Sequence, residues 1–217
     1  MRTAPARKYR ASEKRALTKQ QNRAAIEAAA WEVFCDIGMD AANIRDIVHR
    51  SGVSPGTFYN YFRTKEAIFE VLSQRLLEKI RNENRKARAK AITLEQLLFL
   101  SYSSFLTLLH SIDGAMNFID RNQHHVRSQI YPSSAIKGLA DDLEQDLRRF
   151  IPASAISRHD RALVSSIVIS AGAEAVLNQR QTRPVKKMKH LSEFLTRFMS
   201  RGLSGLLSEP ETRFRHT

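Results

Sequence analysis

Apolar side chains recur at intervals of three and four residues along most of the chain, and no run alternates with β-branched residues. This spacing places apolar side chains on one face of an α-helix, so the pattern predicts an all-α protein. The small numbers of glycine and proline, 8 and 6, agree with that prediction. We predict about nine helices, over residues 18–37, 43–51, 54–62, 64–90, 94–110, 116–130, 135–150, 160–181 and 191–206.

Residues 43–65 predict two short helices joined by a tight turn. Asn43 can cap the first helix, and Gly52 follows where that helix must end. Ser54 suits the N-cap of the second helix, and Pro55 suits its first position. This arrangement predicts a helix-turn-helix that reads DNA with its second helix. The residues predicted to contact DNA are Asn43, Arg45, Ser54, Pro55, Gly56, Thr57, Tyr59, Asn60, Tyr61 and Lys65.

The stretch Gly52-Val-Ser-Pro-Gly-Thr-Phe-Tyr-Asn-Tyr-Phe-Arg-Thr-Lys65 resembles the DNA-binding signature of the TetR family of bacterial transcriptional regulators. The resemblance extends over roughly residues 20–70. Asn43 stands where the family has a threonine, and Tyr61 stands where a histidine is frequent. Within the family pattern, Thr57, Tyr59, Asn60 and Tyr61 enter the major groove. Asn43, Arg45 and Lys65 hold phosphates.

The resemblance also implies the domain organisation. We expect a basic disordered arm over residues 1–18, a three-helix DNA-binding domain over 19–65, and a helical domain for ligand binding and dimerisation over 66–208. A disordered tail is expected over 209–217. The last two helices are expected to form a homodimer, and the dimer is expected to bind a pseudo-palindromic operator in double-stranded DNA.

The formal net charge of +13 indicates a polyanionic partner, either nucleic acid or an anionic membrane. The predicted helix-turn-helix favours DNA, and the most apolar run, residues 94–109, is too short and too polar to span a membrane. The basic arm has two interpretations: it grips phosphates or the minor groove, or it is a solvated tail. Cys35 is the only cysteine, which excludes an intrachain disulfide and fits a reducing cytoplasm.

The predicted helix over residues 94–110 is apolar on nearly all sides, which suits a helix in a core or beside a cavity. We therefore predict a site for an apolar small molecule, with cations at its mouth. Glu174 has three interpretations: it pairs with Arg121 or Arg127, it meets the ligand, or it forms an intersubunit salt bridge. The residues predicted to bind the ligand are Leu98, Phe105, Leu109, Met116, Phe118, Ile119, Arg121, Arg127 and Glu174.

A second resemblance concerns the ligand. Phe118-Ile-Asp-Arg121, Arg127 and Val168-Ile-Ser-Ala-Gly-Ala-Glu-Ala175 are similar to the fatty-acid-responsive branch of the family. That branch governs fatty-acid genes and binds acyl-coenzyme A thioesters. The resemblance implies a long-chain fatty acid or its coenzyme A thioester as ligand.

The sequence contains no phosphate loop, no nucleophile elbow and no pair of carboxylates at catalytic spacing. His124 and His125 are adjacent, so on a helix their side chains diverge and cannot share one metal ion. We therefore expect no enzyme and no cofactor. The prediction is a homodimeric, ligand-responsive regulator of transcription that acts as a repressor. The alternative is a DNA-bound adaptor that recruits a protein partner and binds no small molecule.

Overall fold

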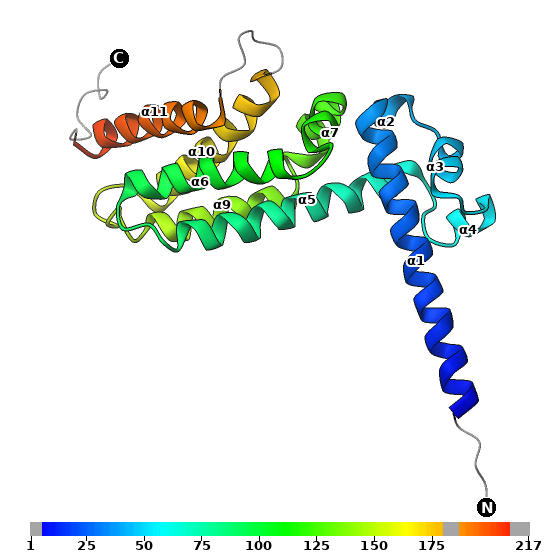
Figure 1. The fold of residues 1–217 in the computed structure, drawn as a ribbon. Helices are drawn as coiled ribbons and strands as arrows, with labels where there is room; N and C mark the ends of the chain where they lie inside the picture. The colour runs from blue at the N-terminus through cyan, green and yellow to red at the C-terminus, as the bar shows by residue number, and fades with distance from the viewer. Residues whose placement is uncertain (1–5, 180–186, 209–217) are drawn as a thin grey trace, which may run out of the picture. The chain divides into compact units, whose positions relative to one another are not determined.

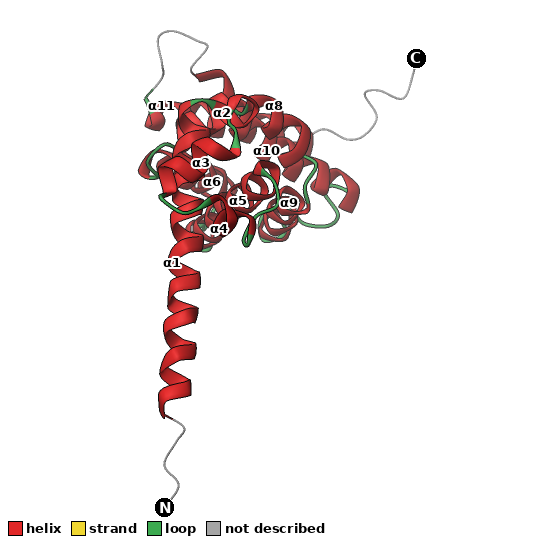
Figure 2. Cartoon of the chain, turned by 90° about the vertical axis from the view of Figure 1, so that its right-hand side faces the viewer, coloured by secondary structure: helices red, strands yellow, loops and turns green. Residues whose placement is uncertain are grey.

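The computed structural model describes residues 6–179 and 187–208, and it contains helices and loops but no strand within those ranges (Figures 1 and 2). The chain divides into two compact units, which we call the head (residues 1–73) and the body (residues 74–217). None of the described helices has the length and apolar character needed to cross a lipid bilayer. The prediction of an all-α fold is confirmed.

The head contains α1 (Ala6–Asp36), α2 (Gly38–Ala41), α3 (Ile44–Ser51), α4 (Pro55–Tyr59) and the first turns of α5 (Lys65–Arg88) (Figure 1). Helix α3 packs against α1, and the rings of Phe34 and Phe69 meet edge to face with centroids 5.5 Å apart. Because α5 contributes to this core, the head continues to Ser73, beyond the predicted boundary at residue 65. The buried apolar side chains are Ile26, Ala29, Ala30, Val33, Phe34, Cys35, Met39, Ala42, Ile47, Phe58, Phe62, Ile68, Phe69 and Leu72.

The prediction of a disordered arm is wrong for residues 6–18, which form the first turns of α1. Residues 6–36 contain neither glycine nor proline, and most of them are alanine, lysine, arginine, glutamate or glutamine. These residues have high helix propensity, so the helix continues N-terminally without an apolar face to bury. Residues 1–5 of the predicted arm and the predicted tail at 209–217 lie outside the described residues.

The body contains the remainder of α5, then α6 (Leu94–Ser111), α9 (Ser134–Leu147), α10 (Arg158–Gln179) and α11 (Met188–Ser208). Helix α6 packs along α11, and α9 packs along α10. Thr93 and Ser133 cap α6 and α9, because each side chain accepts a hydrogen bond from a backbone N–H in the first turn. The fully buried side chains here include Leu97, Leu98, Leu106, Leu109, Phe118 and Leu147.

A single helix was predicted over residues 116–130, but three short elements occur there. They are α7 (Ala115–Arg121), α8 (Gln123–His125) and the π-helical turn η1 (Val126–Ile130). The buried side-chain amide of Asn122 donates a hydrogen bond to the carbonyl oxygen of Phe118 (2.7 Å), and its backbone leaves helical geometry at φ −115°. Asparagine competes for backbone hydrogen bonds in this way, which ends α7. With α2 added, the described residues hold eleven α-helices.

Candidate functional site

Asn43 and Asp46 cap the first turn of α3 reciprocally. The side chain of Asn43 accepts a hydrogen bond from the backbone N–H of Asp46 (3.1 Å), and a carboxylate oxygen of Asp46 accepts one from the N–H of Asn43 (2.9 Å). This capping box satisfies two backbone donors that would otherwise lack partners at the start of the helix. The predicted role of Asn43 as a cap is confirmed. Arg45, two residues after Asn43, is exposed.

The turn between α3 and α4 has the chemistry that the sequence predicts. Gly52 takes φ 71°, a left-handed conformation that a residue without Cβ adopts at little cost. Ser54 then accepts a hydrogen bond from the N–H of Thr57 (3.1 Å), and the two hydroxyl groups are 2.9 Å apart. Pro55 occupies the first helical turn. The hydroxyl of Thr57 is therefore held against the helix start.

Helix α4 turns Phe58 into the core and leaves the next two side chains in solvent. Phe58 is fully buried, whereas Tyr59 is 55% exposed and its ring stands edge-on to Phe58. Asn60 is exposed as well, and Tyr61 is half-buried. The exposed Tyr59 and Asn60 form the outer surface predicted for DNA reading, together with exposed Ser54, Pro55 and Gly56 and half-buried Thr57.

Lys65 makes contacts within the head that the sequence did not predict. Its ammonium group donates hydrogen bonds to the carbonyl oxygens of Met39 (2.7 Å), Asp40 (3.1 Å) and Ala42 (2.8 Å). An ammonium group has three N–H donors, and the carbonyls at the end of a helix lack partners within it. Lys65 therefore fastens the start of α5 to the end of α2. The phosphate contact of Lys65 stays a prediction.

Arg63 is an exposed cation that the prediction left out. It lies in the short segment between α4 and α5, two residues before Lys65. Its charge and its place beside α4 make it a further candidate phosphate contact. The signal in the sequence is the basic pair Arg63 and Lys65, which follows the second helix.

The predicted ligand residues of the body separate into two groups. Leu98, Leu109 and Phe118 have no exposed surface, so they belong to the interior where the helices pack. Phe105, Met116 and Ile119 are half-buried, and Arg121 is exposed at the end of α7. The partly exposed group lies on α6 and the short α7.

Arg127 and Glu174 form the ion pair that was one interpretation of the sequence. Two guanidinium nitrogens donate to the two carboxylate oxygens at 2.8 and 2.9 Å, and the side-chain amide of Asn178 donates to the same carboxylate (2.5 Å). The hydrogen bonds raise the pKa of Arg127 and lower the pKa of Glu174. Both side chains are about half exposed.

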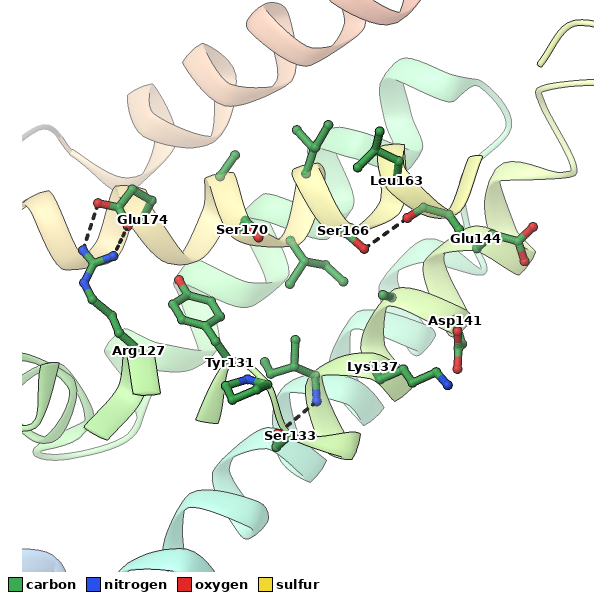
Figure 3. A pocket seen from close by; sticks show the side chains of 17 residues that line it. Arg127, Tyr131, Ser133, Lys137, Asp141, Glu144, Leu163, Ser166, Ser170 and Glu174 are labelled. Carbon is green, nitrogen blue, oxygen red and sulfur yellow. Dashed lines mark hydrogen bonds and ion pairs between the residues drawn. The ribbon is translucent and has the colours of Figure 1, made fainter. Parts of the chain in front are cut away.

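A groove runs between α9 and α10, beginning at this ion pair (Figure 3). We call it the α9–α10 groove; its volume is about 990 Å³. Of the predicted ligand residues, only Arg127 and Glu174 line it. Its other lining residues are Tyr131, Pro132, Ser133, Ile136, Lys137, Ala140, Asp141, Glu144, Ala162, Leu163, Ser166, Ile167, Ile169, Ser170 and Ala171. The sequence signal for this groove is the four-residue spacing of Ile136 and Ala140, and of Leu163 and Ile167, which places each pair on one face of its helix.

A second hollow of about 690 Å³ lies on the other flank of α10, against α11. We call it the α10–α11 hollow. Phe194 and Phe198 stack on α11 with ring centroids 6.3 Å apart, and they are 47% and 65% exposed. Ile167 lines both this hollow and the α9–α10 groove. The apolar surface of α10 is therefore continuous across both flanks of the helix.

Two ion pairs fasten α9 to α5 on a different side of α9. The guanidinium of Arg81 donates to both carboxylate oxygens of Asp142 (2.6 and 2.8 Å), and Arg88 donates to Asp146 (2.7 Å). Arg81 holds the pKa of Asp142 below its usual value. Helix α9 thus lines the groove with one set of residues and holds α5 with another.

Comparisons with known proteins agree with this geometry. Residues 26–72 match the family model described as "Bacterial regulatory proteins, tetR family". An uncharacterized HTH-type transcriptional regulator of Bacillus subtilis, YvdT, is 45% identical over 52 residues, which are 24% of this chain and 27% of the relative. The matched stretch thus spans about a quarter of that relative.

Solved structures resemble a larger part of the chain. The fatty acid degradation regulator FadR of Bacillus halodurans superposes with a TM-score of 0.69 at 20% identity, covering 84% of this chain and 96% of that one. FadR of Bacillus subtilis, solved in complex with stearoyl-CoA, superposes with a TM-score of 0.67 at 20% identity, covering 83% and 98%. At these identities the superpositions establish the fold.

Helices α3 and α4 form a capped helix-turn-helix, and the described residues of the body are all helical apart from loops. The match over residues 26–72 covers all of α3 and α4 and the core that supports them. Residues 26–72 therefore resemble the DNA-binding domain of the tetR family of bacterial regulatory proteins.

Proposed function

We propose that this protein is a homodimeric, DNA-binding repressor of transcription whose operator affinity is controlled by a long-chain acyl-coenzyme A. The observation that carries the proposal is the exposed face of α4, held between a capped start and a buried Phe58. A short helix with one rigid inner face and one polar, aromatic outer face is suited to the major groove.

The DNA contacts divide into those that read bases and those that position the helix. Tyr59 and Asn60 are exposed and meet base edges in the major groove. Arg45 and Arg63 are exposed cations on either side of them and meet phosphates. The N-terminal turns of α1 carry further exposed cations, among them Arg15 and Lys19, which favour the phosphate-gripping interpretation of this segment.

The dimer is supported by the exposed apolar surface of α10 and α11. Leu163, Ile167, Phe194, Phe198 and Leu206 are each about half exposed in the single chain. Large apolar side chains gathered on one surface mark an interaction site. A two-fold dimer through these helices would present two copies of α4 to two half-sites, which one copy of a short helix could not specify alone.

The acyl-chain ligand is supported by the segment from α7 to η1. This segment consists of a seven-residue helix, a short turn and a π-helical turn, and π-helical turns occur often at functional sites. Met116 and Ile119 are half-buried there, and Arg121 is exposed at the end of α7. Each buried CH₂ of an acyl chain gains about 0.8 kcal/mol, and the cation would meet the anionic head group. The stearoyl-CoA complex of FadR, which shares this fold, favours the same ligand class.

The bound ligand would act on DNA through α5. Helix α5 begins in the head and continues into the body, where Arg81 and Arg88 bind α9. A change in body packing would shift α5, and the two copies of α4 would no longer fit successive major-groove faces.

The adaptor function remains the second candidate. It is favoured by the full burial of Leu98, Leu109 and Phe118, because an interior that is already packed leaves less room for a ligand. An adaptor would bind DNA identically and would show no response to any acyl chain.

The decisive experiment uses an operator identified by sequencing DNA fragments captured by the full-length protein. Acyl-coenzyme A thioesters of increasing chain length are titrated into the protein–operator complex, with free coenzyme A as the control. The proposal expects operator affinity to fall as the chain lengthens and Arg121→Ala to blunt the response while leaving DNA binding intact. If the protein captures no specific DNA, the proposal of a DNA-binding regulator is wrong. If it binds an operator that no chain length affects, the adaptor is favoured.

A further inference from the structure

The core of the body leaves little room for a ligand beside the apolar residues that the sequence predicts to bind one. Leu98, Leu109 and Phe118 have no exposed surface and lie where the helices pack. Protein interiors are packed as densely as organic crystals, so a chain of many methylene groups could not enter this core without separating its helices. A groove at the surface of the body is better suited to such a chain.

The α9–α10 groove has the size and the lining that a long apolar chain requires (Figure 3). Its volume of about 990 Å³ lies at the upper end of the range for ligand pockets, about 300–1,000 Å³. The lining residues of α10 extend over a little more than three helical turns, roughly 18 Å, which is on the scale of an extended long-chain acyl group. The apolar walls are formed by Ile136, Ala140, Leu163, Ile167 and Ala171.

The acidic side chains that line the groove each have a cation close by. The pairs are Arg127 with Glu174, Arg148 with Glu144, and Lys137 with Asp141. Each of the two arginines binds its glutamate through two hydrogen bonds of 2.8–3.1 Å, and Arg161 lies 3.7 Å from Glu144. Lys137 and Asp141 are one turn apart on α9. The groove therefore suits an uncharged chain rather than a charged segment.

The end of the groove at Arg127 adjoins the segment from α7 to η1. Tyr131 directly follows η1, is half-buried, and turns its hydroxyl toward α10 (Figure 3). A phenol hydroxyl donates a hydrogen bond, so this group can bind the carbonyl oxygen of a thioester. Helix α7 also contacts α10, and Arg121 is exposed at its end, where a phosphate group of coenzyme A could meet it.

We propose that the α9–α10 groove binds the acyl chain of a long-chain acyl-coenzyme A, with the thioester at Tyr131 and the coenzyme A over the segment from α7 to η1. The proposal rests on the acyl-coenzyme A ligand of the proposed function and adds where its chain lies. Leu163 and Ile167, which are half exposed beside the groove, also belong to the apolar surface that supports the dimer. A second copy packed on α10 would cover the bound chain and exclude water from it.

A chain in this groove would act on α5 through α9. Ala140 and Asp142 are two residues apart, so they project from nearly opposite sides of α9, one into the groove and one toward α5. The guanidinium of Arg81 binds both carboxylate oxygens of Asp142 and lies against Gly138, where an added Cβ would be 3.0 Å from one of its nitrogens. A chain that pushes α9 away from α10 therefore pushes it against the arginine that joins α9 to α5.

The test measures the affinity of the full-length protein for palmitoyl-coenzyme A by titration calorimetry, with free coenzyme A as the control ligand. Ala140→Trp fills the groove, whereas Gln145→Trp adds the same side chain at an exposed position of α9 outside it. We expect Ala140→Trp to weaken thioester binding about tenfold or more, and Gln145→Trp to leave it unchanged. Far-ultraviolet circular dichroism checks that each variant retains its helices.

A second measurement locates the chain without altering the protein, so it decides the question even if Ala140→Trp perturbs α9. A palmitoyl-coenzyme A analogue with a photoreactive diazirine near the end of its chain is irradiated in complex with the wild type. Mass spectrometry then identifies the labelled peptides. Labels are expected within α9 and α10, residues 134–147 and 158–179. Labels confined to α6 and α7 would overturn the proposal.

The remaining outcomes separate the groove from the proposed function. A wild type that binds no acyl-coenzyme A overturns the ligand of the proposed function and the groove site together. Wild-type thioester affinity in Ala140→Trp overturns only the groove site, and a dimer weakened by that variant in sedimentation would assign the groove to the second copy. Arg81→Met should keep the thioester affinity and reduce the shift in operator affinity, because it removes the ion pair with Asp142. An undiminished shift would exclude the route through α9.

Discussion

The hydroxyl of Tyr102 on α6 donates a hydrogen bond to the carbonyl oxygen of Val168 on α10 across 3.2 Å. Burial raises the pKa of this phenol well above its ordinary value, so the hydroxyl stays protonated and remains a donor. The ring of Tyr102 also packs against Gly172, one turn after Val168 on α10. A Cβ added to Gly172 would lie 3.3 Å from a ring carbon of Tyr102. The two helices approach closely there because residue 172 has no side chain.

Gly172→Leu should therefore destabilise the body. The added side chain would collide with Tyr102 and Phe105, and overpacking of a core costs about 1–3 kcal/mol, more than the gain in helix propensity over glycine, roughly 0.8 kcal/mol. The measurement is urea unfolding followed by circular dichroism. Gly205→Ala is the matched control, because nothing lies within 4 Å of its added Cβ, and it should be neutral or slightly stabilising. Equal effects of the two substitutions would contradict the close approach.

Lys65→Met should lower the stability of the head and leave the salt dependence of DNA binding unchanged. The substitution keeps the aliphatic stem and removes three hydrogen bonds to carbonyl oxygens of residues 39, 40 and 42. Loss of hydrogen bonds to a charged donor costs about 1.5–3 kcal/mol. Arg63→Met is the companion variant, and there we expect the slope of log affinity against log salt to fall by about one unit. If Lys65→Met lowers the slope of log affinity against log salt, Lys65 does contact a phosphate.

Tyr59→Ala should weaken binding to the best operator far more than binding to random DNA. Tyr59 is exposed on α4, so its loss removes base-edge contacts without opening the core. A good base contact is worth about 1–3 kcal/mol of discrimination. Tyr59→Phe distinguishes the hydroxyl from the ring. Binding isotherms on matched and scrambled DNA provide the measurement, and a parallel loss on both would mean that Tyr59 does not read sequence.

Deletion of residues 1–16 should leave the remaining fold intact and reduce DNA affinity, most strongly at low salt. The deletion removes Arg2, Arg7, Lys8, Arg10, Lys14 and Arg15. For every phosphate that these cations neutralise, their removal should lower the slope of log affinity against log salt by about 0.9. Melting temperature and salt titrations of the truncated protein test this. An unchanged slope would mean that these turns of α1 are only a solvated helix.

Asp142→Asn should destabilise the body above the ordinary pKa of the carboxyl, and the effect should vanish in acid. The guanidinium of Arg81 lowers the folded pKa of Asp142, whose unperturbed value is 3.8. A lowered folded pKa stabilises the protein above the unfolded value, and this contribution is lost as the pH falls through the folded pKa. Unfolding free energies of the wild type and the variant, measured from neutral pH down to acid, should converge. A constant difference would exclude the ion pair as its cause.

The helix-turn-helix was determined by the sequence because its signals are local. Asn43 and Asp46 are three residues apart, and Ser54 and Thr57 are also three apart, so each cap depends only on neighbouring backbone. Gly52 ends α3 because a left-handed residue is needed at that position. The helices of the body were also predictable from the sequence, because the period of apolar residues depends only on spacing within one segment.

Contacts between distant segments were decided by the tertiary structure alone. Lys65 donates hydrogen bonds to carbonyl groups 23 to 26 residues earlier in the chain. No local sequence pattern distinguishes a lysine that binds such carbonyl groups from one that contacts a phosphate. The break at Asn122 depends on a polar side chain that the fold buries, where its amide satisfies the end of α7. The α9–α10 groove exists because α9 lies along α10, which places Ile136 opposite Ile167. Periodicity shows which side chains share one face of a helix, but only packing between helices shows what that face meets.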